Sequence, residues 1–192
     1  MMTLLEHFVR AFIPLFVAID AIGLAAIFLA MSLGVSPEKR RRTANQAAWT
    51  GGAVALFFLF LGRSVFAALG ITVQDFQIAG GLILFVLAAR DLARSAAEEP
   101  GKLSDDFGVV PLGMPLIAGP ALITTLLLLS ETEGTLMTLV ALAVNLVLVI
   151  LALAWSGTLE KWIGTTGMRA VSKIVALLLA AIAVNMIRRG FL

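Results

Sequence analysis

The chain has 192 residues, of which 60% are hydrophobic and 14% are charged, and its mean hydropathy is +1.04. Soluble domains carry about 25% charged residues, so this composition predicts an integral membrane protein. The net charge of +2 indicates no nucleic-acid-binding surface, and the absence of cysteine excludes disulfides, thiol catalysis and thiolate metal sites. The chain has one histidine and no phosphate-binding glycine loop, nucleophile motif or paired-carboxylate site. The sequence therefore predicts neither an enzyme nor a metal or cofactor site.

Six apolar stretches are long enough to cross a bilayer as helices, which need about 20 residues each. They lie at 8–33, 44–68, 74–94, 108–130, 134–156 and 168–190. The first follows no basic region and exceeds the roughly 7–15 residues of a signal-peptide core, so we expect it to be a transmembrane helix. The sequence thus predicts an all-α, polytopic membrane protein that forms a single integral membrane domain over residues 1–192.

Asp20 lies near the middle of the first stretch, where a charged side chain costs about 2.5–3.5 kcal/mol on insertion scales. Pro14 removes a backbone donor and Gly23 weakens the helix by about 1 kcal/mol, so we predict helix breaks at both. A carboxylate beside the freed backbone at Ala21 would suit an ammonium group, Na⁺ or H⁺. The alternative is an aspartate that hydrogen-bonds a neighbouring helix and serves packing alone.

The fourth stretch contains Pro111, Pro115, Gly119 and Pro120, and we predict breaks at these four residues. A half-helix that begins near Pro120 would direct its N-terminal N–H groups into the membrane centre. The partial positive charge of such a terminus suits a carboxylate. The alternative is a continuous helix that is only kinked by its prolines.

Three further polar residues belong to the predicted substrate site. Thr124 and Thr125 lie one turn beyond Pro120, and their hydroxyls would bond either substrate or their own backbone. Asn145, in the middle of the fifth stretch, would either line the site or join two helices. The glycine pairs at 51–52 and 80–81 are expected to be close-packing points.

The two halves of the chain resemble each other. Pro14 and Pro111 each precede a predicted helix break at a similar distance, and the polar stretch 95–107 separates the halves. The sequence therefore predicts repeats at 1–94 and 108–192, joined by a cytoplasmic linker at 95–107. Three helices in each half require opposite orientations, which gives a 3+3 inverted-topology repeat, a common transporter architecture.

Basic residues predict the orientation of the chain. Ten of the fourteen lie in or beside the loops after the first, third and fifth stretches, against four on the opposite side. Since cytoplasmic loops are enriched in Lys and Arg, these three loops are expected in the cytoplasm and both termini outside. We interpret the run Pro37–Arg42 as a topology determinant in contact with lipid headgroups.

Four segments resemble the motifs of the MarC family of bacterial inner-membrane proteins. They are Ile13–Gly23, Ile78–Phe85, Pro111–Thr125 and Leu179–Ile187, in the order and spacing of that family. The family commonly has proline after the first-helix aspartate, where this chain has Ala21, so a milder break is expected here. The resemblance implies a relation to the LysE-type exporters. Some members of the MarC family are described as transporters of neutral amino acids such as glycine and alanine, which the resemblance therefore suggests as substrates.

Together these features predict a multi-pass transporter of a small solute in a bacterial or archaeal plasma membrane. The expected substrate is a neutral amino acid moved by alternating access, with coupling to H⁺ or Na⁺ at Asp20. The predicted partners are this substrate, the lipid bilayer and, in a homo-oligomer, further copies of the chain. The alternatives are a non-transporting scaffold or partner subunit, and an exporter of another small solute or ion.

Overall fold

The computed structural model describes residues 3–32, 35–93 and 105–191, and this part of the chain is helical with short turns. The predicted linker 95–107 lies outside the described residues except for 105–107. The helices are α1 (Leu4–Ile19), α2 (Ala21–Met31), α3 (Pro37–Leu69), α4 (Val73–Ala93), α5 (Pro120–Leu129) and α6 (Thr135–Gly190). Two π-helical segments, η1 (Gly108–Ile117) and η2 (Ser130–Gly134), precede and follow α5.

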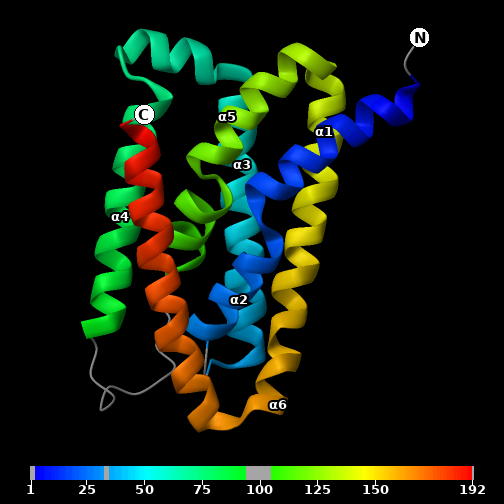
Figure 1. Ribbon diagram of the computed structural model, residues 1–192. Helices are drawn as coiled ribbons and strands as arrows, with labels where there is room; N and C mark the ends of the chain where they lie inside the picture. The colour runs from blue at the N-terminus through cyan, green and yellow to red at the C-terminus, as the bar shows by residue number, and fades with distance from the viewer. Residues whose placement is uncertain (1–2, 33–34, 94–104, 192) are drawn as a thin grey trace.

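Four helical stretches among the described residues are long and apolar enough to cross a membrane. They are Leu4–Met31, Pro37–Leu69, Val73–Arg90 and Pro120–Trp155. Figure 1 shows that the last of these turns round at η2, so that α5 runs up and α6 starts down. The molecule is therefore an all-helical, polytopic membrane protein.

The predicted fifth and sixth helices are joined in the structure. The sequence predicted separate helices at 134–156 and 168–190, whereas α6 covers both in one helical segment. No proline occurs between Thr135 and Gly190, so the backbone hydrogen bonds are not forced to stop. The chain nevertheless reverses direction within α6, whose yellow first part and red last part run antiparallel (Figure 1).

Side chains at the helix starts supply the hydrogen bonds that the first turns cannot make themselves. Thr3 and Glu6 form a capping box at α1, where the Thr3 N–H donates to Glu6 Oε2 at 2.7 Å. Thr72 and Asp75 form the same reciprocal pair at α4, at 2.7 and 3.1 Å. Ser36 accepts from the Lys39 N–H at the start of α3. These caps fix where α1, α3 and α4 begin.

Helix α2 lies in the centre of the bundle. Its buried residues are Ala21, Leu24, Ile27, Phe28, Leu29 and Ala30. One core cluster packs α1 and α2 against α3, η1, α5 and the first part of α6. A second packs Ile27 and Ala30 against Leu84 of α4 and Leu179 and Ala183 of the last part of α6. These contacts place most of α2 in the core, although Ile22 in its first turn is 74% exposed.

The outer faces of α3 and α4 remain apolar although they are exposed. The exposed residues are Leu56, Phe57, Phe60 and Leu61 on α3, and Leu82, Ile83, Phe85 and Val86 on α4. Soluble monomers rarely expose patches of this kind, whereas lipid tails solvate them at no cost.

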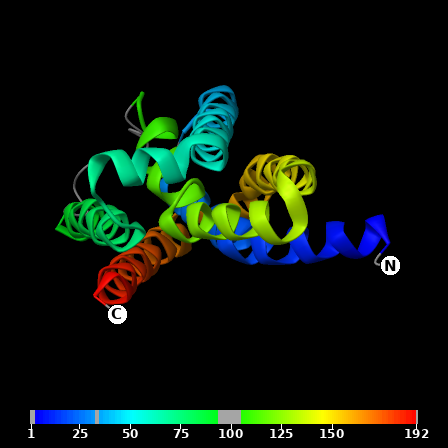
Figure 2. The ribbon, with the colours of Figure 1, turned by 90° about the horizontal axis from the view of Figure 1, so that it is seen from above.

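Figure 2 shows the first turns of α1 extending away from the other helices, at the opposite side from the C-terminus.

A hydrogen bond and an ion pair hold the turn between α5 and α6 to two other helices. His7 Nδ1 of α1 lies 2.6 Å from Glu133 Oε2, and Arg63 of α3 pairs with Glu131. Arg63 also donates to the Leu127 carbonyl at 3.3 Å. The sequence assigned no role to His7. This end of the bundle is therefore closed by contacts from α1 and α3 to η2.

Glycines allow close contact between α3 and η1. A Cβ added at Gly51 would lie 2.8 Å from the Ile117 Cβ and 3.2 Å from the Gly113 carbonyl. At the neighbouring Gly52, the nearest atom to an added Cβ is the flexible end of Leu146, at 3.1 Å. The predicted close packing is therefore confirmed at Gly51, whereas Gly52 meets only the end of a flexible side chain.

Gly51→Ala is expected to destabilise the protein by about 1–3 kcal/mol, because the added methyl must push η1 away from α3. Gly52→Ala is the matched control. It should leave the free energy of unfolding unchanged or raise it by up to about 1 kcal/mol, because alanine has a higher helix propensity than glycine. The measurement is the free energy of unfolding of both variants in detergent micelles. Equal stability of the two variants would contradict this packing.

Candidate functional site

The first apolar stretch is interrupted at one residue, Asp20. Its backbone is left-handed, with φ 50° and ψ 60°, a conformation that aspartate tolerates better than most residues. The Asp20 N–H donates to the Phe16 carbonyl at 3.1 Å, and its own carbonyl accepts from the Leu24 N–H at 2.9 Å. Its Oδ1 accepts from the Gly23 N–H at 3.0 Å. Asp20 thus ends α1 and caps α2.

Two residues predicted as helix breaks lie inside helices instead. Pro14 is within α1, because proline costs a helix one hydrogen bond but its φ suits the helical backbone. Gly23 is the third residue of α2, where Asp20 takes up its N–H. A Cβ at Gly23 would collide with the Asp20 carboxylate, so glycine here makes room for the cap. Ala21 is buried as the first residue of α2.

The second interruption lies between η1 and α5 and has a different cause. Val110 (φ −130°, ψ 123°) and Met114 (φ −143°, ψ 127°) are extended, and each precedes a proline, Pro111 or Pro115. Proline disfavours helical backbone in the residue before it, so η1 is broken twice. Regular helix resumes only at Pro120, in the first position of α5, where the missing N–H is not needed.

This second interruption is packed on two sides by glycines. Gly80 of α4 is in ordinary contact with it, since an added Cβ would lie 3.6 Å from Pro115 and 3.8 Å from Pro120. Gly51 of α3 lies against Ile117 on the other side. Gly119 and Pro120 are both buried. The N-terminus of α5 therefore lies in the interior of the bundle.

The two threonines of α5 use their hydroxyls within the helix. Thr124 Oγ1 donates to the Pro120 carbonyl at 2.7 Å, and Thr125 Oγ1 donates to the Ala121 carbonyl at 2.8 Å. This is the second of the two roles considered from the sequence. Each hydroxyl oxygen still offers lone pairs to a further donor.

Asn145 joins α6 to α1. It is 2% exposed, and its Nδ2 donates to the Ala141 carbonyl at 2.9 Å and to the Phe12 carbonyl at 3.3 Å. The second bond crosses from α6 to the helix that carries Asp20. Asn145 therefore has the packing role, and its contact lies two turns before Asp20 along α1.

The interrupted segments pack together, but their polar groups face different ways. Helix α1 contacts α5 and α2 contacts η1, as the blue and light green segments in Figure 1 show. Ile19 and Ala21 belong to the same core cluster as Ile117 and Leu122. The side chain of Asp20 between them is exposed, in contrast to the buried start of α5. The structure thus brings the two backbones together without placing the carboxylate at the α5 N-terminus.

The predicted substrate-binding residues line neither an apolar cavity between α4 and η1 nor a polar cavity at the start of α3. The apolar cavity has a volume of about 140 Å³. Its lining residues are Phe76, Ala79, Gly80, Ile83, Val110, Met114 and Pro115. The polar cavity has a volume of about 300 Å³. The sequence signal near the polar cavity is the basic run before Thr43, which we interpret from the sequence as a topology determinant in contact with lipid headgroups.

The chain is similar to membrane proteins of archaea and bacteria over nearly its whole length. A UPF0056 membrane protein of Methanocaldococcus jannaschii is 31% identical over 201 residues, which cover 98% of this chain and 88% of that protein. The UPF0056 inner membrane protein YhgN of Escherichia coli is 28% identical over 197 residues, which cover 97% of this chain and 96% of that protein. A UPF0056 membrane protein of Pyrococcus abyssi is 27% identical over 197 residues, covering 99% and 96%.

No solved structure matches the chain. Residues 5–192 match the profile of the MarC family integral membrane proteins. This match includes both interrupted segments and the helices that pack around them. The chain therefore belongs to the MarC family, whose members are multi-pass proteins of the bacterial and archaeal plasma membrane.

Proposed function

We propose that this chain is a transporter that moves a small solute across the plasma membrane by alternating access. It crosses the membrane six times, in two inverted three-helix repeats at 1–94 and 108–192. The observation that carries the proposal is the pair of interrupted segments, at Asp20 and at Ala118–Gly119, which pack against each other. Interrupted helices in corresponding positions of two repeats are where transporters bind substrates and coupling ions.

The chemistry of the two interruptions favours a zwitterionic substrate, a neutral amino acid of the glycine and alanine class. Asp20 supplies a carboxylate for an ammonium group, with H⁺ or Na⁺ as a coupling ion. The N-terminus of α5 at Pro120 supplies partial positive charge for a carboxylate. Thr124 and Thr125 lie within one turn of that terminus and retain acceptor lone pairs.

Alternating access must then bring the two ends of the site together. In the present conformation Asp20 is exposed and the start of α5 is buried. The hydrogen bond of His7 and the ion pair of Arg63 close the bundle at η2, the turn that α5 leads into. Release of this turn frees α5 to move relative to α1. Such rigid-body movement of one repeat against the other is how this class of transporter exposes its site.

A second candidate function is a non-transporting scaffold, and one observation favours it. The interruption at Gly119 is enclosed by neighbouring helices, with Pro115 and Pro120 beside α4 and Ile117 against α3, and the cavity between α4 and η1 is lined by apolar residues. Under this alternative the breaks would exclude water in every conformation. An exporter of another small solute is a third candidate that shares the geometry of the first.

Transport in proteoliposomes distinguishes these candidates. The purified chain should take up glycine or alanine when a H⁺ or Na⁺ gradient is imposed, and empty liposomes should not. Uptake of a different solute from a panel would reassign the substrate but keep the mechanism. Absence of any gradient-driven flux, with correctly folded protein in the vesicles, would favour the scaffold.

Asp20→Asn is expected to reduce transport by at least about tenfold while leaving the fold intact. Asparagine caps helices and adopts left-handed backbone as well as aspartate does, so unfolding should change by less than about 0.5 kcal/mol. Asp75→Asn, at the exposed cap of α4, is the matched control and should transport normally. Wild-type flux with unchanged ion dependence in Asp20→Asn would refute the role of this carboxylate.

Both termini are expected on the outside of the membrane, because ten of fourteen basic residues lie in or beside the other set of loops. A reporter that is active only outside the cytoplasm should be active when fused after Leu192. The same reporter inserted in the stretch 95–107 serves as the opposite control. Activity of the second fusion alone would invert the proposed topology.

A further inference from the structure

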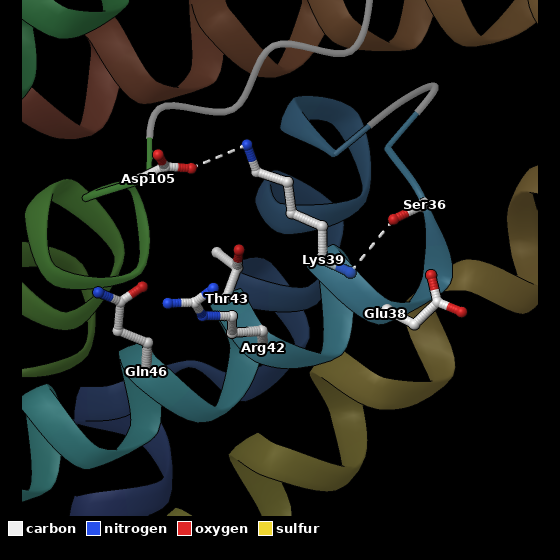
Figure 3. A pocket seen from close by; sticks show the side chains of 7 residues that line it. All are labelled: Ser36, Glu38, Lys39, Arg42, Thr43, Gln46 and Asp105. Atoms are coloured by element: carbon white, nitrogen blue, oxygen red, sulfur yellow. Dashed lines mark hydrogen bonds and ion pairs between the residues drawn. The ribbon is translucent and has the colours of Figure 1, made fainter.

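The polar cavity at the start of α3 has the composition of an anion-binding site. It holds about 300 Å³ and opens at the end of the bundle that carries the basic run Lys39–Arg42. Its lining residues are Ser36, Glu38, Lys39, Arg42, Thr43, Gln46 and Asp105 (Figure 3). No residue of this cavity belongs to the proposed transport site, so the cavity calls for an explanation of its own.

Arg42 is the cation that this cavity leaves available. Lys39 Nζ is engaged by Asp105 Oδ1 at 3.1 Å. Within the described ranges, the guanidinium of Arg42 makes no hydrogen bond or ion pair. Figure 3 shows Arg42 extending to the side of Gln46, while Glu38 points away from both. A guanidinium in this position offers two parallel N–H donors, the geometry that suits a phosphate or carboxylate.

Thr43 supplies an independent sign of a ligand. Its side chain is only 4% exposed, and its hydroxyl has no hydrogen-bond partner in the part of the chain that is described. The hydroxyl is not among the fully enclosed polar atoms that lack a partner, so it reaches the open space of the cavity. It lies next to Arg42 (Figure 3). An oxygen atom of a ligand at this point would accept a hydrogen bond from this hydroxyl.

The cavity is built on two segments. Ser36, the residues of α3 and Asp105, which precedes η1, line it. Gly108, the first residue of η1, lets η1 approach α3 beside it, since an added Cβ there would lie 2.7 Å from both Gln46 Oε1 and the Thr43 carbonyl. A ligand in the cavity would contact α3 directly and η1 through Gln46.

The cavity also lies where a lipid headgroup would be. Trp49 follows Arg42 by two helical turns, on the same face of α3, and is 81% exposed. Tryptophan concentrates at the membrane–water boundary, so Arg42 is at headgroup level. The apolar part of α3 begins directly beyond it. A lipid with its phosphate at Arg42 would have its chains along this apolar face.

We propose that this cavity binds a phosphate oxyanion, carried by the headgroup of an anionic phospholipid. Arg42 holds two phosphate oxygens, and Thr43 and Gln46 donate single hydrogen bonds. Asp105 competes with the phosphate for Lys39, so its carboxylate limits the affinity. The same oxygens are present in free phosphate, and the experiment separates the two sources.

The test uses the full chain purified in an uncharged detergent, titrated with phosphatidylglycerol and followed by native mass spectrometry. Arg42→Gln should weaken the apparent affinity about tenfold, the effect of one charge-assisted contact. Asp105→Asn should strengthen it about threefold, because it removes the negative charge that faces the phosphate in the cavity. Thr43→Val, which keeps the shape of the side chain, should weaken it about threefold.

Arg41→Gln is the matched control, because it removes the same charge from the same helical turn but does not line the cavity. Its affinity should stay within about twofold of the wild type. Equal losses in Arg41→Gln and Arg42→Gln would overturn the proposal, since they would indicate attraction to diffuse surface charge. Binding of phosphatidylglycerol without saturation would overturn it as well.

The second arm adds inorganic phosphate as a competitor. If phosphate does not displace the lipid, and lipid binding requires Arg42, the ligand is the headgroup. If phosphate displaces the lipid from the wild type but does not bind to Arg42→Gln, the cavity recognises the oxyanion and free phosphate also enters it. Displacement that is identical in the two proteins would contradict a site at Arg42.

Discussion

The fold depends on satisfying backbone hydrogen bonds at points where a membrane helix is interrupted. In a bilayer no water is present to bond a free N–H or C=O, so the protein must provide for each of them. At the first interruption the side chain of Asp20 does so, by accepting from the Gly23 N–H across the start of α2. At the second, prolines remove N–H groups, and glycines of α3 and α4 allow the neighbouring helices to enclose the segment.

These two solutions have different functional consequences. An aspartate cap places a charged group at the point where the helix is broken, and the single-residue break keeps α1 and α2 nearly continuous. The proline-rich break is longer and irregular, and it delivers a new helix N-terminus to the bundle interior. A carboxylate on one segment and a helix N-terminus on the other are complementary to the two ends of an amino acid. This complementarity is the physical basis of the proposed transport site.

The sequence predicted the positions of both interruptions, because an aspartate in an apolar stretch and a cluster of prolines are strong local signals. It did not predict that Pro14 would lie inside α1, where the fixed φ of proline suits the helical backbone despite one lost hydrogen bond. The outward direction of the Asp20 side chain follows from its left-handed backbone, which residue type alone does not determine.

Contacts between segments that are distant in the chain could not be predicted from the sequence either. The pairing of His7 with Glu133 joins residues 126 positions apart, and Asn145 reaches Phe12 across 133. No periodicity in the sequence encodes such distances. The polar cavity beside Arg42 likewise joins Asp105 to residues of α3 that lie more than 50 positions earlier in the chain.

Alternating access requires that water reach the second interruption in some conformations. Measuring the accessibility of this interruption to water is the most direct test of the account. Because the chain contains no cysteine, Ala118→Cys introduces a unique thiol at a residue that is fully buried here. The account predicts that a membrane-impermeant thiol reagent labels this cysteine from both sides of the membrane, and that the substrate slows the labelling. Ala141→Cys, equally buried but away from the interruption, should stay unlabelled. Protection of Ala118→Cys from both sides, equal to that of Ala141→Cys, would contradict a transport site between the interrupted helices.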